Sequence, residues 1–156
     1  GCEFAPREEW NADRALPWQC LDHAPHAGVQ RLVRDLNHAL RAHPALHALD
    51  ASPDGFAWID HSDAAHSVLV FERRAPGGER VVVLCNFTPV VREGWRIGVP
   101  AAGTWHELIN TDDAVYGGSG VTNGPLHSDA LPWQGEAQSI VLRLPPLGVA
   151  MLVRED

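Results

Sequence analysis

The chain has 156 residues, of which 45% are hydrophobic and 21% charged, and its formal net charge at pH 7 is -8. This length suits one domain with an appendage and is too short for a complete (β/α)8 barrel, which needs about 250 residues. All the basic residues are arginines, and the excess of carboxylates argues against nucleic acid and anionic membrane surfaces as partners.

The N-terminal third changes from a loop pattern to a helical one. Residues 1–27 carry three prolines and show neither a helical nor a strand period, so we expect a long loop there. From Gly28 to Ala42 the pattern is that of an amphipathic helix, which should end before Pro44. Pro44 fits the first position of a further short helical turn within 44–50. The apolar stripe of the helix consists of Val29, Leu32, Val33, Leu36 and Leu40.

After the turn signal at 52–55, short runs rich in β-branched and aromatic residues replace the helical period. The sequence Ala-Pro-Gly-Gly at 75–78 separates two strongly apolar runs and predicts a hairpin. In the run 138–144, Ile140, Leu142 and Leu144 alternate with Val141 and Arg143 and should face the core. This spacing is typical of an antiparallel β-sandwich. The expected strands are 56–59, 66–73, 80–87, 95–99, 104–109, 138–144 and 149–155.

Cysteine usage and hydropathy bear on the compartment. Cys2, Cys20 and Cys85 make an odd count without Cys-x-x-Cys spacing, which favours free thiols in a reducing environment. No apolar run approaches the roughly 20 residues that span a bilayer, and the first residues lack the pattern of a signal peptide. We therefore expect a soluble cytoplasmic protein.

No motif in the chain predicts catalysis, a metal site or nucleotide binding. His43 and His47 have i,i+4 spacing, but a proline interrupts the helix between them, and no carboxylate or thiol set completes a tetrahedral site. His-Ser-Asp occurs at 61–63 and at 127–129, yet adjacent residues point in divergent directions and cannot form a triad. The glycine-rich YGGSG at 116–120 is not followed by the lysine of a phosphate loop. We predict no catalytic residue, no metal and no cofactor.

Five segments carry a family resemblance: GCEFAPREEWN, GVQRLVRDLNHALRAHPALHALD, GFAWIDHSDAAHSVLVFERR, CNFTPVVREGWRIGVPAAGTWHELINTDDAVYGGSGVTNG and LRLPPLGVAMLVRED. Together they cover nearly the whole chain. The most specific part is 86–123, in which NTD is followed by YGGSG. The chain resembles the C-terminal end of the bacterial glycogen branching enzymes, the 1,4-α-glucan branching enzymes of the α-amylase superfamily.

The resemblance implies a fold and a division of the chain. In this superfamily a (β/α)8 barrel is followed by an all-β domain, so the implied fold is mainly β, an antiparallel Greek-key β-sandwich preceded by a barrel helix. Residues 1–52 would be the remnant of the barrel and residues 53–156 the β domain. The family's catalytic carboxylates come from earlier barrel strands, so the fragment should be inactive. The implied site residues are Glu3, Phe4 and Trp10, which should bind substrate at the rim of the barrel.

The implied function is that of the C-terminal part of an enzyme of glycogen biosynthesis. That enzyme cleaves α-1,4-glucan and transfers the chain to a 6-hydroxyl, which forms an α-1,6 branch. The implied partners are α-glucan and the missing catalytic barrel. Because exposing the stripe of the helix over 28–42 is costly, we expect this helix to dock on the sandwich or to form a homodimer with a second copy. The alternatives are a free-standing carbohydrate-binding β-sandwich module and a small hydrolase built on a His-Ser-Asp run.

Overall fold

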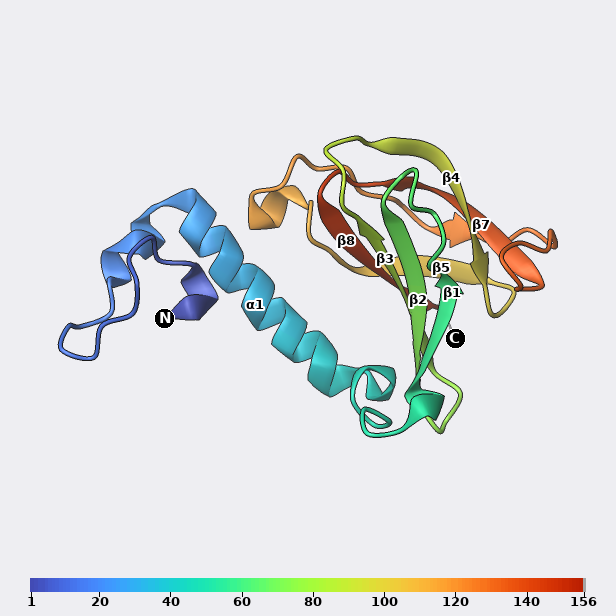
Figure 1. Ribbon diagram of the computed structural model, residues 1–156, viewed down its shortest axis with the longest axis horizontal. Coiled ribbons are helices and arrows are strands. Elements are labelled where there is room, and N and C mark those ends of the chain that lie inside the picture. The colour runs from blue at the N-terminus through green and yellow to red at the C-terminus, as the bar shows by residue number, and fades with distance from the viewer. Residues whose placement is uncertain (156) are drawn as a thin grey trace.

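The computed structural model describes residues 1–155 and shows a long helix lying beside a β-sandwich (Figure 1). The 3-10 helices are η1 (Cys2–Phe4), η2 (Trp18–Asp22), η3 (Pro44–Leu46), η4 (Pro53–Gly55) and η5 (Ala114–Tyr116), and the α-helix is α1 (Ala24–Ala42). The strands are β1 (Phe56–Asp60), β2 (Val68–Arg74), β3 (Arg80–Asn86), β4 (Arg92–Val99), β5 (Thr104–Asn110), β6 (Leu126–His127), β7 (Gln138–Leu144) and β8 (Gly148–Arg154).

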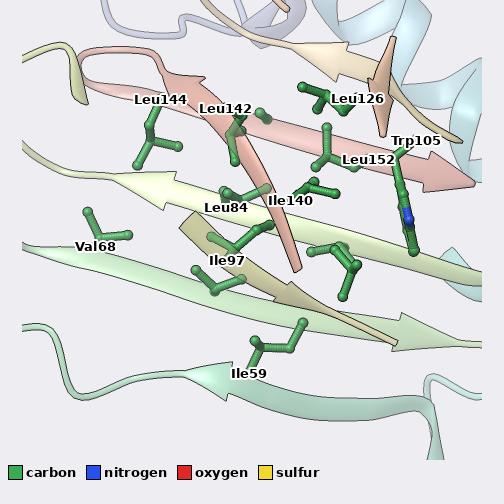
Figure 2. Close-up of a cluster of buried hydrophobic side chains, with 14 residues drawn as sticks. Ile59, Val68, Leu84, Ile97, Trp105, Leu126, Ile140, Leu142, Leu144 and Leu152 are labelled. Carbon is green, nitrogen blue, oxygen red and sulfur yellow. The ribbon is translucent and has the colours of Figure 1, made fainter. Parts of the chain in front are cut away.

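The sandwich consists of a six-stranded sheet in the order β1-β2-β3-β8-β5-β6 and a two-stranded sheet of β4 and β7, all antiparallel. Alternation along each strand sends one row of apolar side chains into the space between the sheets. Ile97 and Ile140 of the small sheet pack there against Leu84 and Leu152 of the large one, with Trp105 closing one end (Figure 2). All five side chains are at most 1% exposed, so this interior is the main core.

The expected strands are all present, which confirms the mainly β, antiparallel fold. The predicted hairpin at 75–78 joins β2 to β3, and Ile140, Leu142 and Leu144 are buried as predicted. The short strand β6 was not predicted, because two residues are too few to show a period.

The helix is longer than its pattern predicts. It begins at Ala24 rather than at Gly28, because Pro25 lies in the first turn, where the missing N–H would have had no partner in any case. The loop expected over 1–27 also contains η1 and η2. Pro44 begins η3 as expected, and Ala45 of this turn packs against Val81 on the outer face of the large sheet.

The helix lies against the β domain through an unexpected face. Its buried residues are Gly28 and Ala39, whereas Leu40 of the apolar stripe is 42% exposed and the other four stripe residues are only half-buried. At 100° per residue, the stripe is centred about a quarter turn away from the Gly28–Ala39 face. The helix therefore docks on the sandwich without burying its stripe there, which differs from our expectation.

The first anchor of α1 is the loop that contains η5. The Tyr116 hydroxyl donates a hydrogen bond to Asp35 at 3.1 Å, and the Arg31 guanidinium donates to the carbonyl of Val115 at 2.6 Å. Gly28 lies so close to this loop that a Cβ atom on it would be 2.2 Å from the carbonyl oxygen of Tyr116. The backbone approach therefore requires glycine at position 28.

The second anchor is Glu79, in the turn between β2 and β3. One carboxylate oxygen accepts a hydrogen bond from the Ala45 N–H at 2.8 Å, and the other lies 2.7 Å from Nδ1 of His43. The carboxylate thereby satisfies a backbone N–H group exposed just beyond the end of α1. Helix and sandwich are thus joined at two points along the helix.

Candidate functional site

An exposed group of aromatic side chains, the β1 aromatic cluster, consists of Phe56, Trp58 and Phe71. Phe56 and Trp58 project from β1 on the face opposite the core, and Phe71 of β2 pairs with Trp58. The ring of Phe56 lies 5.0 Å from that of Trp58, edge to face, and 5.3 Å from that of Phe71. The third pair, Trp58 and Phe71, is 5.9 Å apart. These are favourable geometries for aromatic pairs, so the rings hold one another in place.

The cluster stays open because β1 is the edge strand of the large sheet. Trp58 is 50% exposed and Phe56 37% exposed. Polar groups flank the rings: His61 lies 5.6 Å from Trp58, and Arg73, opposite Phe56, bonds to the Gly55 carbonyl and to Asp50. A rigid aromatic surface beside hydrogen-bonding groups is suited to stacking on the C–H face of a sugar ring.

The three residues predicted at the rim do not form a single surface. Phe4 is fully buried against Trp18, at a ring distance of 5.5 Å, and its carbonyl accepts a hydrogen bond from His26 Nδ1 at 2.8 Å. Glu3 is exposed. A hydrogen bond with its own backbone lowers the pKa of Glu3.

Trp10 is the remaining rim residue and is 77% exposed. It lines a hollow of about 460 Å³ with Asn11, Arg14 and the acidic Glu8 and Glu9. An exposed indole beside carboxylate, amide and guanidinium groups could bind a sugar by stacking and hydrogen bonding. The role of Glu3, Phe4 and Trp10 in substrate binding stays a prediction.

The NTD and YGGSG motifs build one closed loop. Asp112 is only 9% exposed, and its carboxylate accepts hydrogen bonds from Ser119 N and Oγ and from Val121 N at 2.7–2.9 Å. Burial alone raises the pKa of Asp112, but these bonds outweigh burial, so its pKa lies below the ordinary value. Gly118 approaches so closely that a Cβ would be 2.1 Å from the Asp112 carbonyl oxygen. The motif therefore holds the η5 loop against α1.

The first His-Ser-Asp tripeptide serves a turn, whereas the second spans the end of β6 and a β-bridge between Asp129 and Ser139. In the first copy, Ser62 bonds to Asp60 and Asp63 bonds to His66. In the second, Asp129 pairs with Arg96 at 2.9 Å. The members of each copy thus bond to residues outside it, and neither tripeptide forms a triad.

Neither a metal centre nor a membrane segment is found in the part of the chain that the structure describes. No group of three His, Cys, Asp or Glu side chains within residues 1–155 could hold a metal ion. Over the same residues, no helix combines the length and apolarity that crossing a membrane requires.

Sequence reasoning missed the β1 aromatic cluster. The alternation of Phe56 and Trp58 was visible in the sequence, but the third ring comes from another strand. Only the pairing register, which sets Trp58 opposite Phe71, shows that three rings meet. The signal available in the sequence was a pair of aromatic residues, Phe56 and Trp58, at alternate positions of a short predicted strand that follows a turn.

Comparisons with known proteins identify the family of the chain. The family described as "Alpha amylase, C-terminal all-beta domain" matches residues 58–155. The chain is 52% identical over 148 residues to the 1,4-alpha-glucan branching enzyme GlgB of Cereibacter sphaeroides, which covers 94% of this chain and 20% of that protein. It is 50% identical over 153 residues to GlgB of Rubrobacter xylanophilus, covering 97% of this chain and 21% of that one.

A solved structure, the alpha-amylase from H. orenii, matches with a TM-score of 0.48 and 16% identity, over 81% of this chain and 20% of that chain. The chain spans about a fifth of the length of the curated relatives it matches. The matched residues contain all eight strands except the start of β1. The chain therefore belongs to the family of α-amylase C-terminal all-β domains.

Proposed function

We propose that this chain is the C-terminal part of a 1,4-α-glucan branching enzyme of glycogen biosynthesis, with residues 1–52 contributed to a catalytic barrel and residues 53–156 forming the accessory β domain. Identity of about 50% over nearly the whole chain to two branching enzymes is the observation that carries the proposal. The enzyme would cleave α-1,4-glucan and join the released chain to a 6-hydroxyl. The three free thiols fit a cytoplasmic protein.

The half-exposed stripe of α1 supports the same proposal. Full burial of an aliphatic side chain contributes about 1.5–3 kcal/mol, and these side chains have gained only part of it, so a further surface that covers the stripe would be stabilising. We propose that the cover is the preceding part of the longer polypeptide. A homodimer through α1 is the rival cover, and sedimentation velocity of the isolated chain decides between them. A monomer at micromolar concentration is the expected result.

Fusion tests the proposed activity directly. The chain should replace the corresponding C-terminal fifth of the Cereibacter sphaeroides enzyme, and the chimaera should branch amylose, measured as the fall in iodine-complex absorbance. The same assay on this chain alone should give no branching. Turnover by the chain alone, or an inactive chimaera that is shown to be folded, would contradict the proposal.

We further propose that the β1 aromatic cluster contacts α-glucan. Its support is the open edge position of Trp58, the fixed packing of the three rings and the flanking His61 and Arg73. Glu3 and Trp10 remain proposed substrate contacts in the N-terminal segment. Phe4, also proposed for the substrate site, has a buried side chain and would act by holding this segment in place.

Replacing Trp58 by alanine should weaken the binding of maltoheptaose about two- to tenfold, because packing of a ring face on an indole contributes on the order of 0.5–1.5 kcal/mol. Isothermal titration calorimetry measures the change. The matched control is Trp133→Ala, since Trp133 is 45% exposed and lies outside the cluster. An equal loss in both variants would contradict a site at β1.

The same titration distinguishes this proposal from the alternative of a free-standing carbohydrate-binding module. Such a module should bind maltoheptaose with a dissociation constant well below the millimolar range without any other domain. An accessory surface that adds to a catalytic site can function with weaker affinity, because linked sites reinforce one another. We therefore expect millimolar binding by the isolated chain.

A further inference from the structure

Three arginines lie in one row across the large sheet. Arg74 of β2 pairs with Arg80 of β3. The β3–β8 register, which sets Val81 opposite Val153, places Arg154 of β8 opposite Arg80 when it is carried one residue further. All three side chains belong to the face of the sheet that carries the core, at the end where the core meets solvent. Directly opposed residues of antiparallel strands have Cα atoms about 5 Å apart, so like charges in this row repel one another.

A single buried carboxylate faces this row. Glu72 is fully buried, and both Arg74 and Arg80 pair with it, the latter at 3.1 Å. Arg154 takes part in none of the ion pairs formed within residues 1–155. Three guanidinium groups against one carboxylate leave an excess of positive charge, in a chain whose formal net charge is -8.

The row opens into a hollow of about 620 Å³ that Arg80 and Arg154 line. Its apolar wall includes Trp105, which pairs with Arg154 in the β5–β8 register, and Pro100 and Ala101. This volume lies in the range of about 300–1,000 Å³ that is usual for small-ligand sites. The hollow combines space, an apolar wall and two cationic groups from adjacent strands.

The remaining ionisable groups that line the hollow are Glu79 and His43. The carboxylate of Glu79 is already engaged at both oxygens, by the Ala45 N–H and by His43. It therefore opposes an anion less than a free carboxylate would, because its charge is already shared with two donors. The charges around the hollow therefore favour an anionic ligand over a cationic one.

We infer that the hollow between the β2–β3 turn and the end of β8 binds a phosphate group, as free phosphate or as a phosphate monoester, held between Arg80 and Arg154. Guanidinium groups bind phosphate oxygens through paired, charge-assisted hydrogen bonds, which makes arginine well suited to this ligand. Binding would relieve the repulsion along the arginine row. This inference is independent of the proposed contact with neutral glucan.

Isothermal titration calorimetry of the chain with inorganic phosphate, at constant ionic strength set with sodium chloride, tests the inference. Arg154→Gln should weaken phosphate binding by about tenfold or more, because it removes a charge-assisted contact. Arg80→Gln should have a similar effect, although it also removes a partner of buried Glu72, so its folding is checked by circular dichroism. The matched control is Arg143→Gln on β7, which removes the same charge from an exposed site and should leave the affinity within about twofold.

Titration with glucose 6-phosphate and with glucose distinguishes the source of the phosphate group. Tighter binding of the ester than of inorganic phosphate assigns the hollow to a phosphorylated sugar, and equal binding assigns it to free phosphate. Either result supports the inference. It is overturned if neither anion binds, if glucose binds as tightly as its phosphate, or if Arg143→Gln lowers the affinity as much as Arg154→Gln does.

Discussion

Replacing Gly28 by alanine should destabilise the chain by about 2 kcal/mol, although alanine is the better helix former. In an ordinary helix interior the same substitution would stabilise by about 1 kcal/mol. Here the added Cβ would lie 2.2 Å from the carbonyl oxygen of Tyr116, so the η5 loop must move away from α1. The hydrogen bonds from Tyr116 to Asp35 and from Arg31 to Val115 would then lengthen or break. Urea denaturation followed by circular dichroism measures the change.

The sign of the change in unfolding free energy distinguishes a close contact at Gly28 from an ordinary helix position. Asn37→Ala is the matched control, because Asn37 is an exposed position in the same helix and should gain a few tenths of a kcal/mol from propensity alone. Hydrogen exchange of the amides in 112–121 should rise in Gly28→Ala and stay unchanged in Asn37→Ala. A more stable Gly28→Ala variant would show that the loop does not lie against the helix.

Asp112→Ala should destabilise the chain by about 3 kcal/mol. The substitution leaves the buried N–H group of Val121 and the part-buried N–H group of Ser119 without their acceptor, and an unsatisfied buried donor costs about 1–3 kcal/mol. Thermal unfolding measures the loss. Its neighbour Asp113 provides the control, because Asp113 caps only the Val115 N–H, and Asp113→Ala should cost about 1 kcal/mol. Equal losses in the two variants would contradict the role assigned to Asp112.

The lowered pKa of Asp112 also predicts a pH dependence. A carboxylate whose pKa is lower in the folded than in the unfolded chain stabilises the fold above its ordinary value of 3.8. That contribution is lost as the pH falls through the folded value. The stability difference between the wild type and Asp112→Asn should therefore be constant near neutral pH and shrink below pH 3.8. A difference that stays the same down to acid pH would contradict this origin.

Local sequence patterns predicted the helices and strands, whereas contacts between residues distant in the sequence decide how these elements pack together. Alternation identified the strands, and the proline-glycine turn identified the β2–β3 hairpin, because both signals lie within a few residues. The helix face that meets the sandwich was not predictable in this way. Gly28 must be small because the η5 loop, more than eighty residues away in sequence, lies beside it.

The candidate sites were harder to predict for the same reason. The three rings at β1 and the three arginines at the far end of the sheet each come from different strands, and only strand order and register bring them together. The family resemblance instead predicted Glu3, Phe4 and Trp10 as site residues. One of these is buried, because the GCEF segment folds back on Trp18 and His26.

The quarter-turn offset between the two faces of α1 has a practical consequence for protein engineering. One face of α1 lies against the β domain while its aliphatic stripe stays partly exposed, so a splice between helix and sandwich would sever the contacts of Tyr116 and Glu79. Grafts that exchange this β domain between enzymes should carry the helix with it and place the crossover ahead of Ala24. Crossovers within 43–55 would instead pair a helix from one parent with a docking loop from the other.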